Sequence, residues 1–343
     1  MKKIYKLVIP IFIILFFGFL LFTKIGPYDK NNTKDIVVDI PMGSSVKDIT
    51  DILYDKKLIK SKMVFKYNVK SSKKASEFKA GKYKLNQTLT NNEIIDIIAS
   101  GKVFNEGIKV TFPEGLTYKE TIDILVKNNL GKKETYEALI NSPKDFYDKF
   151  EFLNQEDIIS LEGFLYPSTY YFKENATEKE ILEVMLSQFD KVYDEKLKLR
   201  QKEVDMTLQE VINLASIVEK EAVLDEDRPI IASVFFNRLD IDMPLQSDAT
   251  IQYAFDKRKE IVTYNDLEIN SPYNSYKNKG LPPTPIANPS IKSIEAVLYP
   301  KETDYLYFVA KVDGGNNYST TYEQHLKYVE EYREERDKLK KQN

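Results

Sequence analysis

Cysteine and tryptophan are absent from the 343 residues of this chain, and histidine occurs once, at position 325. The lack of cysteine excludes disulfides and thiol chemistry, and such a composition fits either side of a bacterial membrane. A single histidine excludes histidine-rich metal sites and any catalytic triad that needs another histidine. His325 lies in a strongly charged C-terminal segment, so we expect it at the surface.

An excess of charge of one sign is also lacking, because 50 basic residues face 53 acidic ones. This balance gives no argument for a nucleic-acid partner. The sequence holds no G-x-G-x-x-G, no P-loop, no G-x-S-x-G and no H-E-x-x-H motif. What remains is carboxylate chemistry beside amides and 23 tyrosines, which suits cleavage of glycosidic bonds and implies no cofactor.

A long apolar run stands at the N-terminus, from Leu7 to Phe22, and lysines precede it at positions 2, 3 and 6. The lysines place the N-terminus in the cytoplasm by the positive-inside rule. A cleaved signal peptide is the competing interpretation, but no small-x-small cleavage site follows the run. We therefore expect a single-pass membrane anchor at residues 1–25, a linker at 26–35 and the rest of the chain outside the cytoplasm.

A strand–turn–helix unit repeats after the linker. Pro41–Leu53 aligns with Pro113–Leu125 without a gap, and Gly81–Ile98 is a looser third copy. Each copy follows or contains a β-rich run and starts its helix with a capping box, such as Ser45 with Asp48. Residues 36–125 are therefore predicted to form small modules that either pack on one another or bind glycan as LysM domains do.

The stretch Thr207–Ala222 is the centre of the prediction. Thr207 and Glu210 form a capping box, and the following apolar residues have the spacing of a buried helix. Glu219 and Glu221 end this helix about 200° apart around its axis. Glu221 continues the apolar stripe, so burial should raise its pKa as a general acid requires. The alternative is that both carboxylates are solvated at a frayed helix end.

Two further helices and a hairpin complete the expectation. Thr177 opens an amphipathic helix that we expect to run to about Glu203, and Arg228–Leu239 forms another. Tyr305–Ala310 pairs with Tyr318–Thr320 across two glycines. A hydrolase built on Glu221 would need a second carboxylate, for which Glu162, Glu219 and Asp248 are the candidates. A lytic mechanism, in which the sugar's own 6-hydroxyl attacks, needs none.

Several long motifs occur in a fixed order, namely Glu162–Pro167, Leu214–Glu221, Ala232–Leu239, Met243–Asp248, Pro272–Tyr276 with Gly280–Pro283, and Tyr305–Val309. With these motifs the sequence resembles the endolytic murein transglycosylases, the MltG or YceG-like family. The resemblance implies an α+β protein with an N-terminal transmembrane helix, a LysM-like subdomain at 36–103 and a mixed α/β catalytic domain at 104–343. It also implies internal cleavage of peptidoglycan glycan strands, which leaves 1,6-anhydro-N-acetylmuramic acid ends. The family further suggests that the protein works beside the peptidoglycan synthases, where it terminates nascent strands.

The resemblance assigns Glu221 as the catalytic residue. It assigns substrate contacts more weakly, to Glu162, Tyr166, Glu219, Asn237, Gln246, Asp248, Tyr273, Asn274 and Tyr276. The segment 162–166 and the loop 273–283 would form the walls of a groove. Ser275 stands where the family has threonine, which bears on details of sugar binding. Two rival functions stay open, a two-carboxylate muramidase and a non-catalytic peptidoglycan-binding scaffold.

Overall fold

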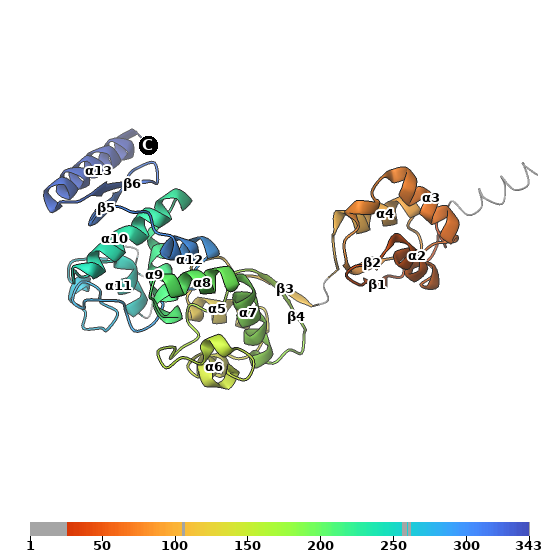
Figure 1. The fold of residues 1–343 in the computed structure, drawn as a ribbon, viewed down its shortest axis with the longest axis horizontal. Helices are drawn as coiled ribbons and strands as arrows, with labels where there is room; N and C mark the ends of the chain where they lie inside the picture. The colour runs from red at the N-terminus through yellow and green to blue at the C-terminus, as the bar shows by residue number, and fades with distance from the viewer. Residues whose placement is uncertain (1–25, 105–106, 256–258, 260–261, 343) are drawn as a thin grey trace, which may run out of the picture. The chain divides into compact units, whose positions relative to one another are not determined.

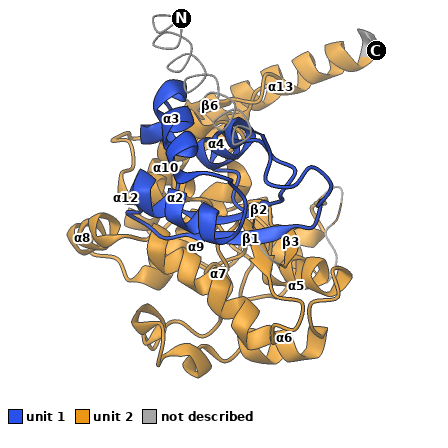
Figure 2. Cartoon of the chain, turned by 90° about the vertical axis from the view of Figure 1, so that its right-hand side faces the viewer, with its two compact units in different colours: residues 1–106 blue, residues 107–343 orange. Residues whose placement is uncertain are grey.

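The computed structural model describes residues 26–104, 107–255, 259 and 262–342. Two compact units make up the chain, residues 1–106 and 107–343 (Figure 2). The predicted membrane anchor at residues 1–25 lies outside the described residues. A search of the described helices finds none with the length and apolar character of a transmembrane span.

The described part of the first unit, residues 26–104, contains one small sheet and three α-helices (Figure 1). β1 (Ile36–Ile40) pairs antiparallel with β2 (Gly81–Leu85), with Ile36 opposite Leu85. The remaining elements are α2 (Val46–Asp55), α3 (Lys62–Ser72), the short η1 (Ala75–Glu77) and α4 (Asn91–Ser100). Alternate strand residues, such as Val38 and Tyr83, enter a core shared with Leu53 and Phe65.

The predicted repeats are present as strand–turn–helix modules, and all three capping boxes form, at Ser45, Thr90 and Thr117. Two copies, β1–α2 and β2–α4, share the first unit. The copy that begins near Pro113, with β3 (Ile108–Thr111) before it and α5 (Tyr118–Lys127) after it, belongs to the second unit. There β3 pairs antiparallel with β4 (Thr169–Phe172) and not with a strand of another repeat.

The second unit is mostly helical, and with its small sheets it gives the mixed α/β architecture that the sequence predicted. After α5 its elements are α6 (Lys133–Ile140), η2 (Pro143–Phe146), η3 (Glu151–Leu153), β4, α7 (Glu178–Val192), α8 (Glu195–Glu203), α9 (Leu208–Glu221), η4 (Asp225–Asp227), α10 (Arg228–Asp240), α11 (Asp248–Ala254), η5 (Asp266–Glu268), α12 (Ile291–Leu298), β5 (Tyr307–Ala310), β6 (Asn316–Ser319) and α13 (Tyr322–Gln342). The predicted hairpin is β5–β6.

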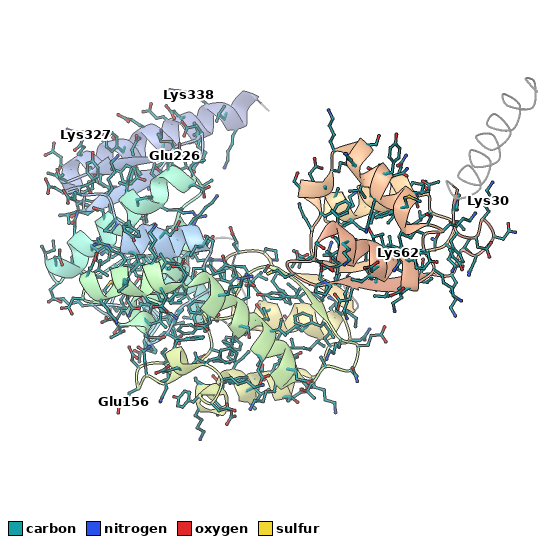
Figure 3. The ribbon with its side chains drawn as sticks, turned by 45° about the vertical axis from the view of Figure 1, so that its right-hand side comes forward. Lys30, Lys62, Glu156, Glu226, Lys327 and Lys338 are labelled. Atoms are coloured by element: carbon teal, nitrogen blue, oxygen red, sulfur yellow. The ribbon has the colours of Figure 1, made fainter. Side chains whose placement is uncertain are left out.

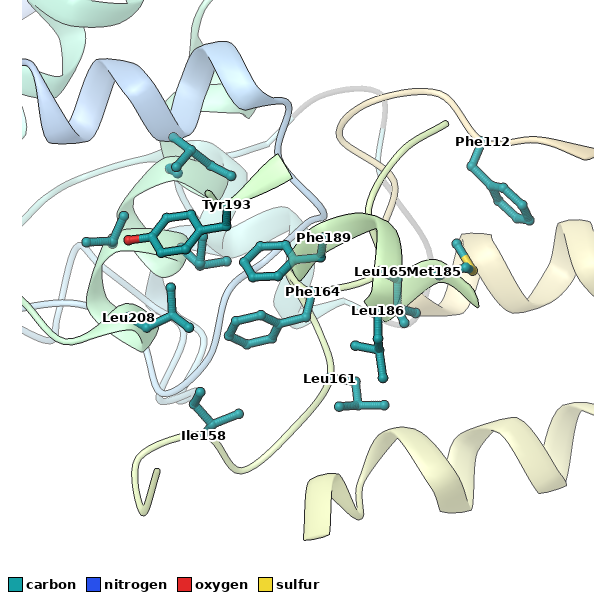
Figure 4. Packing of buried hydrophobic residues seen from close by; sticks show 14 of the residues in the cluster. Phe112, Ile158, Leu161, Phe164, Leu165, Met185, Leu186, Phe189, Tyr193 and Leu208 are labelled. Carbon is teal, nitrogen blue, oxygen red and sulfur yellow. The ribbon is translucent and has the colours of Figure 1, made fainter. Parts of the chain in front are cut away.

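Helix α9 runs through the core of this unit. All of its residues from Leu208 to Val218 except Glu210 are buried, and it packs against α10 and α12. Beside it, Phe164, Phe189 and Tyr193 form a row of packed rings (Figure 4), with 5.2 Å between the first two centroids and 5.7 Å between the last two. Leu208, the first residue of α9, is labelled in the same cluster.

Two expectations need correction. The single helix predicted up to Glu203 is two helices, because Asp194 accepts hydrogen bonds from the N–H groups of Lys196 and Leu197 and so caps a new helix, α8. His325 is half-buried instead of at the surface, since its ring stacks on Tyr307 with 5.4 Å between centroids. The charge of α13 concealed this contact with β5.

Candidate active site

Glu219 and Glu221 lie in the last turn of α9 and face different parts of the structure. Its capping box starts the helix at Thr207, and the last residue in helical geometry is Glu221, where the Ala222 N–H bonds back to Val218. Because α9 is buried as far as Val218 in its last turn, its end cannot fray without loss of core packing. The alternative of two solvated carboxylates therefore does not describe this helix end.

Glu219 faces α10 and α12. Its carboxylate lies 3.1 Å from the Arg228 guanidinium and accepts bonds from the hydroxyls of Ser290 at 2.6 Å and Ser293 at 2.7 Å. The side chains of Glu219 and Arg228 are 6% and 8% exposed, so this is a buried ion pair with hydroxyl donors around it. The carboxylate joins three helices and does not line the cavity described next.

Glu221 points into a cavity of about 390 Å³ in the second unit. Three pieces of structure meet there: the first turns of α5, the end of α9, and α11 with the segment after it. The lining residues are Thr117, Lys119, Glu120, Asp123, Lys220, Glu221, Asp248, Ala249, Gln252, Tyr253, Phe255, Val262 and Ile286.

Burial raises the pKa of the Glu221 carboxyl above its ordinary value. The Ser247 hydroxyl donates a hydrogen bond to Glu221 and opposes that shift, whereas the negative charge of Asp248 adds to it. A carboxyl with a raised pKa keeps its proton nearer to neutral pH, which is the state that a general acid needs.

A network of hydroxyls supports Ser247 from behind. The hydroxyls of Ser275 and Thr250 form a hydrogen bond of 2.7 Å. The Ser275 hydroxyl oxygen also accepts a hydrogen bond of 3.0 Å from the Ser247 N–H. The Gln246 N–H donates to the Ser275 carbonyl, and Gln246 itself has φ +49°, a left-handed conformation that is uncommon for glutamine. Ser275 stands where the family that the sequence resembles has threonine. Its hydroxyl therefore still contacts and positions Ser247.

Asp248 and Tyr276 form the rim beside Glu221. The Tyr276 hydroxyl donates to Asp248 at 2.7 Å, and this bond joins the loop 270–289 to the start of α11. Burial raises the pKa of Tyr276 above its ordinary range, so its hydroxyl remains a donor at neutral pH. Asp248 is exposed and lines the cavity, which places it near Glu221 as a second acidic group.

Glu162 is fully buried behind the cavity wall. It accepts from the Tyr118 N–H at 2.9 Å, from the Tyr253 hydroxyl at 3.0 Å and from the Asn288 amide at 3.4 Å. Burial raises its pKa to about 8. Tyr253 lines the cavity and packs on Tyr273, with 4.9 Å between ring centroids. Glu162 thus supports the cavity wall from behind and is not among the residues that line the cavity.

The other predicted contacts lie away from the cavity lining. Asn237 donates to the carbonyls of Thr303 and Tyr305 at 2.7 and 2.9 Å. Asn274 is fully buried and donates to the carbonyls of Leu267 and Ile269, just before its loop. Tyr166 is half-buried against the core, and the exposed Gln246 side chain is not part of the lining. Of the ten predicted residues, the structure brings Glu221 and Asp248 into the cavity, with Tyr273, Tyr276 and Glu162 behind or beside it.

Sequence reasoning missed Ser247, Tyr253 and Asn288. Ser247 stands in the motif Met243–Asp248, but it lies 26 positions from Glu221, and no local pattern pairs the two residues. Asn288 accepts from the N–H groups of Gly163 and Leu165 and so holds the segment that carries Glu162. These bonds join residues more than 120 positions apart, for which the local sequence carries no signal. Among the described residues, no cluster of histidine and acidic side chains is arranged to hold a metal ion.

Two substitutions beside Glu221 should shift its pKa in opposite directions. Ser247→Ala removes a donor that stabilises the ionised carboxylate, so the pKa should rise and the alkaline limb of the kcat/KM profile should move to higher pH. Asp248→Asn removes a repelling charge, so that limb should move to lower pH. If the chain cleaves glycan strands, as the sequence resemblance implies, profiles of that activity against pH test this. Shifts of the same sign in both variants would contradict the assigned environment.

Comparison with known proteins places the chain among relatives that match nearly its whole length. An endolytic murein transglycosylase of Bacillus subtilis (strain 168) is 39% identical over 316 residues, covering 89% of this chain and 87% of that protein. A protein of the same name from Streptococcus pneumoniae (strain ATCC BAA-255 / R6) is 33% identical over 89% of this chain, which spans 60% of the pneumococcal protein.

The fold agrees with these sequence matches. A crystal structure of a YceG-like protein from Listeria monocytogenes superposes with a TM-score of 0.60 and 37% identity, covering 86% of this chain and 99% of that one. The model of the YceG-like family matches residues 38–331, which cover most of both units and every residue that lines the cavity. With its motifs in the family's order and this match over most of its length, the chain belongs to the YceG-like family.

Proposed function

We propose that this protein is a peptidoglycan lytic transglycosylase and that Glu221 is its catalytic acid and base. The observation that carries the proposal is the position of Glu221, at a rigid helix end in a cavity, with a raised pKa and a hydroxyl partner. The names of the Bacillus and Streptococcus relatives support murein as the substrate class.

Glu221 acts twice in the proposed reaction. In the first step it gives its proton to the oxygen between N-acetylmuramic acid and N-acetylglucosamine, and the bond from that oxygen to the anomeric carbon breaks. In the second step the 6-hydroxyl of the same muramic acid attacks the anomeric carbon, and Glu221 takes the hydroxyl proton. The bond count balances without water, because the new ring bond replaces the glycosidic bond.

The location of the other acids favours this single-carboxylate scheme. Three carboxylates were candidates for the second catalytic group. Glu162 is buried behind the cavity wall, where it accepts a hydrogen bond from Tyr253, and Glu219 forms a buried ion pair with Arg228. Asp248 alone among them lines the cavity, and it accepts from Tyr276. Glu120 and Asp123 of α5 also line the cavity, so a two-carboxylate muramidase would use Asp248 or one of these acids. The products of the reaction separate the two schemes.

The finer parts of the proposal concern where the enzyme works. The segment at residues 1–25 would anchor it in the cell membrane, with residues 26–343 outside the cytoplasm. The first unit, with its strand–turn–helix modules, would act as a LysM-like subdomain that holds a glycan strand. Internal cleavage of strands as the peptidoglycan synthases release them would terminate their growth.

The experiment incubates the full chain in detergent with uncrosslinked glycan strands and measures product masses. We expect internal fragments one water lighter than hydrolysis products. Fragments at the full hydrolytic mass would replace the proposal by a two-carboxylate muramidase. Intact strands with both the full chain and an inactive variant would favour a scaffold.

A further inference from the structure

The first unit carries a positive charge that the composition of the whole chain conceals. Residues 26–104 hold fifteen lysines against nine acidic residues, although the whole chain has a net charge of −3. Eight of these lysines fall between positions 56 and 74, and that stretch contains no aspartate or glutamate. Two of the eight are neutralised, Lys62 by Asp51 and Lys74 by Asp96, each at 2.8 Å.

Helix α3 presents this charge on one face, together with two apolar side chains. Val64, Phe65 and Val69 of α3 enter the core of the unit. The exposed positions Met63, Lys66, Tyr67 and Lys70 have spacings of three and four residues, so they share the opposite face. Met63 is 71% exposed and Tyr67 is 73% exposed. Figure 3 shows the side chains of this unit, with Lys62 labelled at the start of α3.

We propose that this α3 face, made of Met63, Lys66, Tyr67 and Lys70, docks on an anionic membrane surface. Lysines beside exposed methionine and tyrosine are what such a surface accommodates, because the ammonium groups meet lipid phosphates while the apolar side chains enter the headgroup region. Met63 and Tyr67 project into solvent and do not pack in the core of the unit, so the fold itself does not require them.

The length of the connecting chain permits this docking. The proposal rests on the membrane anchor proposed above, whose apolar run ends at Phe22. Thirteen residues separate Phe22 from β1, and such a segment reaches at most about 45 Å. A unit of this size is about 25–30 Å across, so any of its faces can turn toward the bilayer. The tether also raises the local concentration, so a weak surface attraction is sufficient.

The absence of tryptophan supplies a sharp test. Tyr67→Trp in the full chain, reconstituted in vesicles, places the single indole on the α3 face. We expect its emission to shift to shorter wavelength, and to be quenched by brominated lipid, in phosphatidylcholine vesicles that contain phosphatidylglycerol but not in phosphatidylcholine alone. Met63→Trp should behave in the same way. Tyr322→Trp, at a site 59% exposed on α13, is the control and should not shift.

Charge reversal completes the test. Lys66→Glu with Lys70→Glu should abolish the shift of Tyr67→Trp, and added salt should weaken it. Equal emission in neutral and anionic vesicles would overturn the proposal. So would a shift that requires added glycan strands, since that result assigns the face to glycan binding. Glycan cleavage measured in the same vesicles reports separately on Glu221, so loss of docking and loss of catalysis are distinguishable.

Discussion

Glu221→Gln is expected to lower kcat for glycan cleavage by about 10²–10⁴-fold, the range of general acid–base catalysis. The upper end is expected, because one side chain serves both proton transfers in the proposed reaction. Glutamine fills the same volume and can still contact Ser247, so the fold should be retained. Product formation from uncrosslinked strands, measured at saturating substrate, gives kcat directly.

The control for this prediction is a glutamate of the same unit that is outside the cavity. Glu226 in η4 is exposed, labelled in Figure 3, and absent from the cavity lining. Glu226→Gln should leave kcat and KM unchanged. If Glu221→Gln kept most of the wild-type kcat while it remained folded, the catalytic assignment would be wrong, and Asp248→Asn would be the next variant to measure.

Arg228→Ala is expected to destabilise the protein by about 3–5 kcal/mol, the typical result of removing one partner from a buried ion pair. The reason is that Glu219 would remain buried with its charge opposed by hydroxyl and N–H donors alone. The free energy of unfolding of the second unit, from urea titration of the full chain in detergent, measures the effect.

A matched exposed pair separates burial from charge in this result. Lys327 and Glu323 on α13 form an ion pair at 3.0 Å in which both side chains are mostly exposed; Figure 3 labels Lys327. Lys327→Ala should therefore cause no measurable loss of stability. Equal small losses in Arg228→Ala and Lys327→Ala would show that Glu219 does not anchor the end of α9. Restored stability in Arg228→Met with Glu219→Leu would support the desolvation argument.

Local patterns in the sequence predicted the parts of the fold that depend on neighbouring residues. Capping boxes at Ser45, Thr117 and Thr207 form as expected, because each needs two side chains three residues apart. The break between α7 and α8 was missed, although Asp194 is a good N-cap residue, since the apolar period continues through it. The pairing of β3 with β4 depends on a contact across some sixty residues, which no local pattern specifies.

The same distinction applies to the candidate site. The helical period separates Glu219 from Glu221 and predicts which one continues the apolar stripe. It does not reveal that Arg228 receives Glu219, nor that Ser247 reaches Glu221, because both contacts form between elements. Glu162 and Asn274 lie in family motifs and were read as substrate contacts. Their full burial and their hydrogen bonds to the backbone indicate that the motifs also record how the cavity wall is built.

The central claim is that Glu221 drives an intramolecular attack by the sugar's 6-hydroxyl and not an attack by water. The most direct measurement is cleavage of glycan strands in ¹⁸O-labelled water by the full chain, followed by mass analysis of the new muramic acid ends. Attack by the 6-hydroxyl yields anhydro ends that contain no ¹⁸O, and this is the expected result. One ¹⁸O atom in each newly formed end would contradict it and establish hydrolysis.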